Sequence, residues 1–517
     1  MITEMGTNNT NEAETRTGEP EKGERGVALL WVAGMLVALL GVSAFAVDLG
    51  WLYLNTSRLQ KAADAAALAG VVNLPASPVQ ADVEAQGAAS ANKFPIGNPV
   101  SNTFGSQVLT ENRYEVTLGT EVDTFFLRVL GINSFDIQRV ATAQYVLPVP
   151  MGSPANCFGI GNLNALNSGR FPSGQSPDTA RGLCDDYTQN FWAAINGQQT
   201  AKEQGDPFMS RCFSSSSGSC SGSPNPNDEW NTVNHYHYGI TVPNSAPSLH
   251  VWIYDGVFYD RNDFNLDTGD FDWNGGGSTA GGANTVYALK RPDLTPYDPT
   301  DNVTACTMTV NSGASAATYQ NRWARICNPS GPFGGTWVLK VTTTGNIGGT
   351  NQYSILVNTG NIAAGSLMPR VYGINDMSIF TNQPSGTAVV WLAEILPVHA
   401  GKKLQLNFFD GGESSPPATM TVKNPAGATA GGCAWTATNG ASGSSCAITT
   451  ANSSGAIFNN HWITINIDIP DNYTCNPAAN NNSGCYWKMD LATQSAHDRT
   501  TWSARVIGNP VRLVPNG

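Results

Sequence analysis

The N-terminal part of the chain contains one long uncharged stretch, the 21 residues from Val27 to Val47. As a helix rising about 1.5 Å per residue, this stretch would be roughly 30 Å long, the thickness of the hydrocarbon core of a bilayer. Helix-favouring sequence follows without a break, which favours a retained anchor over a signal peptide cleaved near Ala44–Ala46. We expect a disordered cytoplasmic tail at 1–24, then a transmembrane helix at 25–75 that continues into an extracytoplasmic helix.

Beyond the apolar stretch, small residues follow one face of the expected helix. This face comprises Leu52, Leu59 and Ala66, which recur at seven-residue spacing, with Ala62, Ala63 and Ala69 beside them. Such a face lets a helix approach a neighbour closely, and the neighbour is either its own domain or another subunit. Asp48 directly follows the apolar stretch, so it either marks the outer boundary of the membrane or contacts a partner.

The pattern then predicts a small α/β domain over residues 76–147. Val79–Asn92 has the composition of a short helix, while Tyr114–Leu118 and Phe135–Val146 have the partial alternation of strands. After residue 150, short β-branched or aromatic segments alternate with Gly, Asn and Pro turns. That alternation is typical of antiparallel sandwiches and jelly rolls.

The β-rich part repeats itself. Leu249–Gly256 matches Leu404–Gly411 at a separation of 155 residues. Four further pairs keep the same order along the chain: Ile240–Pro243 with Ile395–Pro397, Leu289–Pro292 with Val422–Pro425, Gly335–Val341 with Asn460–Asn466, and Tyr353–Val357 with Tyr486–Leu491. We therefore predict a mainly β chain in which a linker with a disulfide loop (148–187) precedes two tandem β-sandwich, jelly-roll-like domains (188–360 and 361–517) produced by an internal duplication.

Composition narrows the possible partners. Charged residues make up 13% of the chain, against about a quarter in a typical globular protein. In their place stand 54 Gly and 30 Pro, which supply turns. The net charge of −12 argues against nucleic acid, because nothing here could neutralise a phosphate backbone.

The ten cysteines all lie after residue 150 and group into five neighbouring pairs. The pairs are Cys157/Cys184, Cys212/Cys220, Cys306/Cys327, Cys433/Cys446 and Cys475/Cys485. No C-x-x-C spacing of the kind that zinc sites use is present, so we interpret them as five local disulfides. Buried free thiols are the alternative. Disulfides require an oxidising compartment, which places the C-terminal bulk outside the cytoplasm and the N-terminus inside.

An acidic segment of the first repeat is a candidate metal site. Asp263, Asn265 and Asp267 alternate as at the start of an EF-hand-like calcium loop, and Asp260 and Asp270 flank them. The glycine falls one place late, and the twelfth position carries no Glu. Two interpretations stay open, a calcium site and an acidic surface turn with Asx capping.

Other candidate chemistry is sparse. His235 and His237 could reach a metal from one strand face, although without a third ligand they are more simply ordinary strand residues. The 13 Trp and 15 Tyr could form a platform for surface glycans or a core. No H-E-x-x-H, G-x-S-x-G or Walker motif occurs, and we expect no enzymatic activity.

Several N-terminal elements together resemble one family. They are Arg25-Gly26, the apolar stretch, Val47-Asp48-Leu49-Gly50, Leu52-Tyr53, Leu59-Gln60 and the run Ala62–Ala69, followed more loosely by Val122–Phe126, Gly131-Ile132 and Ala141–Ala143. This set resembles the N-terminal region of the TadE/TadG-like proteins of the tight-adherence (Flp) pilus assembly system. The resemblance covers residues 24–147.

The resemblance implies a pilin-like head at 76–147, a single pass through the cytoplasmic (inner) membrane, and partners among pilus or secretion-system proteins. It also implies a structural or adhesive role rather than a catalytic one. The alternative is a membrane-tethered carbohydrate-binding or hydrolytic envelope protein whose groups converge from distant loops. Neighbouring genes for a secretion ATPase and a prepilin peptidase would favour the first, and a dense acidic or His cleft would favour the second.

Overall fold

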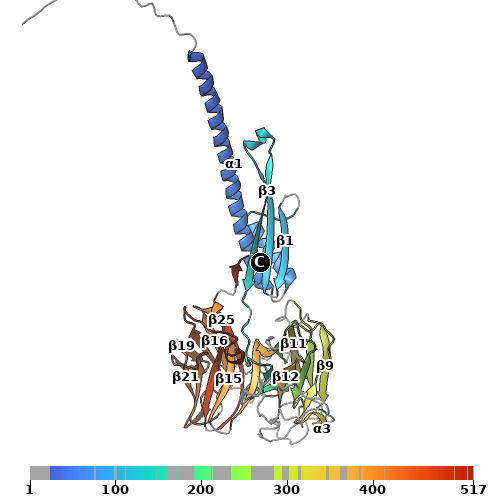
Figure 1. The fold of residues 1–517 in the computed structure, drawn as a ribbon. Coiled ribbons are helices and arrows are strands. Elements are labelled where there is room, and N and C mark those ends of the chain that lie inside the picture. Colours follow the sequence, from blue (N-terminus) through green and yellow to red (C-terminus); the bar gives the residue numbers. More distant parts are fainter. Residues whose placement is uncertain are drawn as a thin grey trace, which may run out of the picture. The chain divides into compact units, whose positions relative to one another are not determined.

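The computed structural model describes residues 24–74, 77–97, 102–110, 112–146, 148–159, 172, 191–198, 200–210, 212, 227, 235–257, 284–293, 302–311, 316–344, 349–360, 369–383, 386–412, 414–493, 495–508 and 511–515. These residues form a mainly β fold with one long apolar helix at the N-terminal end and several sheets (Figure 1). The fold class expected from the sequence pattern is therefore confirmed.

Helix α1 (Glu24–Asn73) runs without a break through the apolar stretch and the small-residue face. It contains no proline, so no intrahelical hydrogen bond is lost along its length. Helix α2 (Pro78–Ala91) begins one residue before the predicted helix. Ser77 Oγ accepts the N–H of Gln80 at 3.2 Å, and Pro78 occupies the first turn, where its missing N–H costs no bond.

The chain divides into two compact units. The first unit comprises α1 up to Ala65 together with Gln86–Gly105 and Thr117–Val140. The second comprises Ala66–Ala85, Ser106–Val116 and Ala141–Gly517. The first sheet along the chain has the order β1-β2-β3-β26, with strands β1 (Thr103–Thr110), β2 (Arg113–Asp123), β3 (Ser134–Tyr145) and β26 (Val511–Val514).

The β-rich body of the second unit contains two further small sheets. One has the order β13-β6-β11-β8-β9, with β13 (Arg370–Ile374), β6 (His235–Val242), β11 (Gly335–Thr344), β8 (Asn284–Lys290) and β9 (Thr304–Asn311). The other has the order β15-β24-β18-β21-β22, with β15 (Gly386–Glu394), β24 (Tyr486–Thr493), β18 (Ala418–Lys423), β21 (Ala447–Asn452) and β22 (Gly455–Ala456).

A large sheet extends across the whole body. Its order is β10-β7-β12-β5-β14-β25-β16-β23-β19-β20, with β4 added to β12 and β17 added to β25. The strands are β4 (Cys157–Phe158), β5 (Phe191–Asn196), β7 (His250–Tyr254), β10 (Trp323–Arg325), β12 (Thr350–Asn358), β14 (Asp376–Gln383), β16 (Lys403–Phe409), β17 (Ser414–Ser415), β19 (Cys433–Ala437), β20 (Ser442–Gly443), β23 (Trp462–Asp468) and β25 (Ser495–Ile507). Short helices are η1 (Leu127–Leu130), η5 (Lys202–Gln204), α3 (Ala316–Tyr319), η6 (Pro397–His399) and α4 (Ala479–Asn482).

The body contains two copies of one strand arrangement. In the first copy β11 lies between β6 and β8, and β7 pairs with β10 and β12. In the second copy β24 lies between β15 and β18, and β16 pairs with β23 and β25. In chain order, β6, β7, β8, β10, β11 and β12 thus correspond to β15, β16, β18, β23, β24 and β25, which agrees with the duplication predicted from the sequence.

Two of the sequence matches within the repeat are wrong. Matching Gly335–Val341 with Asn460–Asn466 joins β11 to β23, whereas β11 corresponds to β24. Matching Tyr353–Val357 with Tyr486–Leu491 joins β12 to β24, whereas β12 corresponds to β25. Both matches slip by one strand, because buried strands rich in β-branched and aromatic residues resemble one another whatever their place in a sheet.

Strands β5 and β14 join the two copies. β5 pairs with β12 of the first copy and with β14, and β14 pairs with β25 of the second copy. One hydrophobic core consequently runs through both copies, from Tyr238 and Tyr353 in the first to Phe408 and Trp502 in the second. Figure 1 shows the two groups of strands, one containing β9, β11 and β12 and the other β15, β16, β19, β21 and β25.

Residues 148–158, which the sequence places in a linker, are built into this body. Met151 is buried, and its carbonyl accepts the N–H of Gly373 at 2.9 Å. The carbonyl of Pro150 accepts the N–H of Glu394, also at 2.9 Å. Because Gly373 lies in β13, which pairs with β6 of the first copy, and Glu394 lies in β15 of the second, this segment ties the copies together.

Candidate functional site

No described part of the chain covers the N-terminal half of α1. Between Val27 and Val47 every side chain is exposed except Ala44, which is partly buried. Within the described residues, α1 contains the one segment that is long and apolar enough to cross a membrane, and none of that segment is buried. A contiguous apolar surface of this size requires lipid or another protein to cover it.

The C-terminal half of α1 is covered by its own chain. Leu59, Ala62, Ala63, Ala66 and Ala67 are all fully buried. The small-residue face therefore packs inside the subunit, which decides between the two alternatives that the sequence left open. The exposed side chains of α1 lie mostly before Leu59.

Asp48 links α1 to the hairpin between β2 and β3. Its carboxylate accepts three backbone N–H groups, those of Phe125 (2.8 Å), Phe126 (2.9 Å) and Leu127 (2.6 Å), and the residue is 4% exposed. These donors lie at the start of η1, where free N–H groups favour a negative charge. Trp51 packs edge-on against Phe125, with 5.4 Å between the ring centroids. Asp48 thus has a bonding partner within its own chain.

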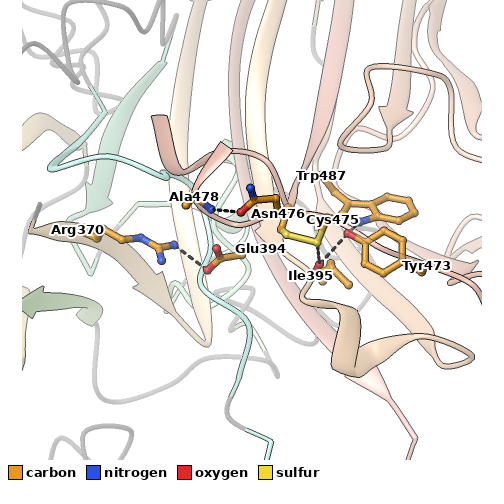
Figure 2. The surroundings of a disulfide bond; sticks show 9 residues. Arg370, Glu394, Ile395, Tyr473, Cys475, Asn476, Ala478 and Trp487 are labelled. Carbon is orange, nitrogen blue, oxygen red and sulfur yellow. Dashed lines mark hydrogen bonds and ion pairs between the residues drawn. A yellow bond between two sulfur atoms is a disulfide. The ribbon is translucent and has the colours of Figure 1, made fainter. Parts of the chain in front are cut away.

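Among the described residues, both cysteines are present for three of the five predicted disulfides, and all three bonds are formed. They join Cys306 to Cys327, Cys433 to Cys446 and Cys475 to Cys485. Cys157 and Cys212 are also disulfide-bonded, whereas Cys184 and Cys220 lie outside the described residues. Figure 2 shows the loop closed at Cys475, where the Tyr473 hydroxyl donates to the carbonyl of Ile395 at 2.7 Å and accepts the indole N–H of Trp487 at 3.3 Å.

The predicted calcium loop lies outside the described residues. Asp260, Asp263, Asn265, Asp267 and Asp270 all fall between 258 and 283, so calcium binding stays a prediction. Within the described part of the chain, no group of three or more His, Cys, Asp or Glu side chains is arranged to hold a metal ion.

The predicted histidine pair is real but has basic neighbours. The rings of His235 and His237 lie 4.4 Å apart on β6. Burial lowers the pKa of His237 to about 3, helped by the charges of His235, Lys340 and Lys290. Two lysines beside an imidazole oppose the binding of a cation, so these residues are better explained as strand residues than as metal ligands.

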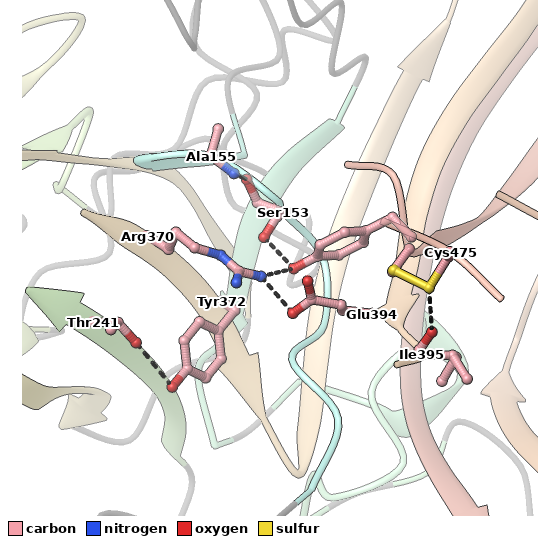
Figure 3. Close-up of polar contacts among 10 residues, drawn as sticks. Ser153, Ala155, Thr241, Arg370, Tyr372, Glu394, Ile395 and Cys475 are labelled. Carbon is pink, nitrogen blue, oxygen red and sulfur yellow. Dashed lines mark hydrogen bonds and ion pairs between the residues drawn. A yellow bond between two sulfur atoms is a disulfide. The ribbon is translucent and has the colours of Figure 1, made fainter. Parts of the chain in front are cut away.

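A partly buried ion pair connects β13, which pairs with β6 of the first copy, to β15 of the second. Arg370 of β13 donates to Glu394 of β15 at 2.8 Å and to the hydroxyl of Tyr486 at 3.2 Å. That hydroxyl in turn donates to the carbonyl of Ser153 at 2.6 Å, and Figure 3 shows Arg370, Glu394 and Ser153 converging. The carboxylate and the tyrosine hydroxyl raise the pKa of the Arg370 guanidinium against the effect of burial.

Two cavities flank residues 146–150 of the second unit. The larger, of about 450 Å³, is lined by Lys402, Arg505 and Asp376, and the smaller, of about 270 Å³, by Arg370 and Glu394. His399 lines both cavities and is 3% exposed, with no hydrogen-bond partner at Nδ1. Burial, followed by the charges of Lys402 and Arg512, lowers the pKa of His399 to about 4. The larger cavity has more basic than acidic groups, which favours an anionic ligand over a cationic one.

The aromatic side chains serve mainly as core. The buried tryptophans are Trp192, Trp252, Trp323, Trp337, Trp391, Trp487 and Trp502. A platform for glycans needs exposed rings, so these seven tryptophans are not available for that role.

These features define a class of protein in which an uncovered apolar half-helix precedes a disulfide-bonded β body. Residues 26–77, which coincide with most of α1, match the Tad family of TadE/G-like Flp pilus-assembly proteins. The match confirms the resemblance over the N-terminal region and supports involvement in Flp pilus assembly with partners in that system. No curated protein matches the chain.

Likeness to solved structures is slight. The exported protein XepA of PBSX shares 8% identity over 54% of this chain and 79% of its own, with a TM-score of 0.14. The CBM22-1–CBM22-2 tandem domain of Xyn10C from Paenibacillus barcinonensis shares 10% identity over 53% of this chain and 78% of its own, with a TM-score of 0.12. Such values carry no argument about this chain.

Proposed function

We propose that the chain is a membrane-anchored extracytoplasmic component of a tight-adherence (Flp) pilus assembly system, with a structural or adhesive role rather than a catalytic one. The observation that supports this proposal most is the coincidence of the family match at 26–77 with α1. The first half of that helix is apolar and uncovered, as a membrane anchor requires.

The proposed location is the cytoplasmic (inner) membrane, with the N-terminus in the cytoplasm and the β body outside. Disulfide bonding of the body supports this orientation, because cytosolic thiols are normally kept reduced. Among the described residues, one apolar stretch has membrane-spanning length, which supports a single pass.

Because one half of α1 is uncovered and the other is covered, the helix suggests which part of the chain would contact the pilus machinery. The small side chains between Leu59 and Ala67 that could pack closely against another helix are already buried within this chain. The part left for helix–helix contact is the membrane segment itself, where small residues such as Gly34 and Gly41 leave open space beside the backbone. The β body would then extend toward the pilus, the cell wall or a surface.

The test is complementation of a deletion strain in the native host. We expect loss of Flp pili on deletion, measured on sheared filaments, and recovery with the intact chain. A chain carrying Leu36→Arg and Leu40→Arg should be lost from alkali-extracted membranes and fail to restore pili, because arginine is costly at the centre of a span. Val303→Arg, at an exposed apolar position of the body, is the matched control and should behave as the intact chain does.

Normal pilus number in the deletion strain would contradict the proposal. If that strain instead lost a glycan-hydrolysing or glycan-binding activity that the purified chain restores, the alternative function would be favoured. Co-purification of the intact chain with Flp assembly proteins from solubilised membranes gives a second, independent readout.

A further inference from the structure

The hairpin between β2 and β3 ends in an exposed apolar turn. We call residues Phe125–Ile132 the hairpin tip. Val129 is 85% and Leu130 77% exposed, and Phe125, Phe126 and Ile132 are also exposed. Turns between strands are usually polar, so five exposed apolar side chains in eight residues require a covering surface.

The hairpin tip is fixed to α1 at one level. The three N–H bonds to Asp48 and the ring contact with Trp51 hold its start against residues 48–51 of the helix. All these residues belong to the first compact unit. The position of the tip along α1 is therefore set by the position of Asp48.

Asp48 comes directly after the apolar stretch. If residues 27–47 fill the hydrocarbon core, about 30 Å at 1.5 Å per residue, Asp48 and the hairpin tip both lie at its outer edge. Trp51 and Tyr53 follow within the next turn of α1. Together with Phe125 and Phe126 they place four aromatic rings where membrane proteins commonly carry an aromatic belt.

The surroundings of the hairpin tip limit how deeply it can enter lipid. Asp123 and Asp136 are exposed on the strands just behind it, and a carboxylate is costly in hydrocarbon. Arg128 is exposed among the apolar residues, and its Nε donates to the carbonyl of Thr124 at 2.8 Å. An apolar turn with one cation suits shallow insertion at the headgroup boundary, and the acidic side chains behind it would stay in water.

We propose that the hairpin tip is a second membrane contact, which inserts its apolar side chains into the outer leaflet beside α1. The occupant is lipid rather than protein because the patch is continuous with the lipid-facing surface of the helix and is held at its boundary. Two contacts joined by Asp48 fix the rotation of the first unit about the helix axis. The inference rests on the proposed membrane anchoring.

The experiment uses the full chain reconstituted in vesicles of phosphatidylethanolamine and phosphatidylglycerol. A polarity-sensitive fluorescent amino acid is introduced genetically at Leu36, at Val129 or at Val303, and quenching by lipids with a shallow or a deep nitroxide is compared. We expect the deep nitroxide to quench strongest at Leu36, the shallow one strongest at Val129, and neither at Val303. Adding Leu130→Glu, or Leu130→Ser as the milder variant, should reduce the quenching at Val129 toward the Val303 level.

Separate outcomes test the anchor and the hairpin tip. Quenching at Leu36 without quenching at Val129 would overturn the inference and leave the anchor standing. Absence of quenching at both positions would overturn the anchor as well. Energy transfer between differently labelled copies at Val129, without lipid quenching there, would identify a second copy as the occupant and also overturn the inference.

Discussion

A single carboxylate, that of Asp48, holds the hairpin tip to α1. We expect Asp48→Ala to release it, because three backbone N–H groups lose a charged acceptor whose bonds are each worth about 1.5–3 kcal/mol. Hydrogen exchange of the amides of residues 125–127, followed by mass spectrometry on the full chain, should accelerate. Asp64→Ala is the matched control on the same helix, since Asp64 accepts only the side-chain amide of Gln60 among the bonds described for it. Unchanged exchange at 125–127 would show that the hairpin is held by other contacts.

The role of Asp48 could be predicted only in part from the sequence. Its place after the apolar stretch indicated either a boundary or a contact, but its partners lie 77–79 residues further along the chain. No local pattern specifies such a pairing. The sequence of the hairpin tip does contain a local signal, because five apolar residues in a turn are unusual. These residues contributed only to the family resemblance.

The turn at Asp255 is a position at which the two copies could have been aligned from the sequence. Asp255 has a positive φ of 51°, its N–H donates to the carbonyl of Arg322 at 3.1 Å, and its carboxylate accepts the N–H of Asn321. Asn321, which also has a positive φ, comes two residues before Trp323. The repeated Asp-Gly dipeptide is a local signal for a shared turn, because these residues tolerate such a backbone.

The second copy reproduces this turn. Asp410 has a φ of 58°, its N–H donates to the carbonyl of His461 at 3.1 Å, and its carboxylate accepts the N–H of Asn460. Trp462 therefore corresponds to the tryptophan that begins β10, and not to the one in β11 with which the sequence matched it. The error arose because Trp462 was matched with Trp337 instead of Trp323, although only Trp323 has, like Trp462, an asparagine two residues before it.

Elements with a strong local pattern were predicted more closely than the others. The bounds of α2 and β3 differ from the predicted ones by one residue at each end, because apolar periodicity and a Ser-Pro start are local signals. Strand β1 was missed because most of its side chains are exposed, which leaves no alternation to detect. Strand β26 was missed because four residues near a C-terminus carry too little pattern.

Strand β26 gives an element-level test. It pairs antiparallel with β3, from Val511 opposite Tyr145 to Val514 opposite Thr142. Removing residues 509–517 should expose this edge, so the amides of 142–145 that bond β26 should exchange faster. Because β26 is short and partly exposed, the loss in stability should be only about 1 kcal/mol per hydrogen bond. A double substitution Arg512→Ser and Leu513→Ser keeps the backbone and should leave the exchange nearly unchanged. Equal acceleration in both chains would mean that the side chains hold β26 in place.

The body as a whole was predicted as two sandwiches, and the topology shows how they are combined. β5 and β14 complete one sheet across both copies. The ion pair of Arg370 and Glu394 adds a polar connection between them. Sequence could not show this, because β5 and β14 lie outside the repeated segments and an ion pair 24 residues apart has no local signature. The two copies are therefore expected to unfold together.

Buried titratable groups in the body make that unfolding depend on pH. The pKa of His237 is lowered to about 3 and that of His399 to about 4, against about 6.5 for an unperturbed histidine. Between these values the unfolded chain binds more protons than the folded one, so each histidine reduces stability as the pH falls below about 6.5. Asp206 acts in the opposite direction. Burial raises the pKa of Asp206 to about 6, so the folded chain gains a proton at a higher pH than the unfolded chain does. The contribution of Asp206 to stability therefore rises as the pH falls from about 6 to 4.

The pKa values of His250 and His461 are lowered as well, and that of Asp376 is raised, in each case mainly by burial. Four histidines with a lowered pKa against two aspartates with a raised pKa should make acid destabilising overall. For His237 the loss amounts to about 2 kcal/mol by about pH 5, since the pH is then about 1.5 units below the unfolded pKa. Thermal unfolding of the full chain in detergent between about pH 7 and pH 4.5 measures the effect. His237→Gln should flatten the acid-side decrease in the melting temperature. Asp206→Asn should steepen it, because a group that opposes the histidines is removed while an oxygen remains to accept the hydroxyl of Tyr236. If both variants shifted the curve in the same direction, the dependence would arise from general loosening of the body and not from these protonations.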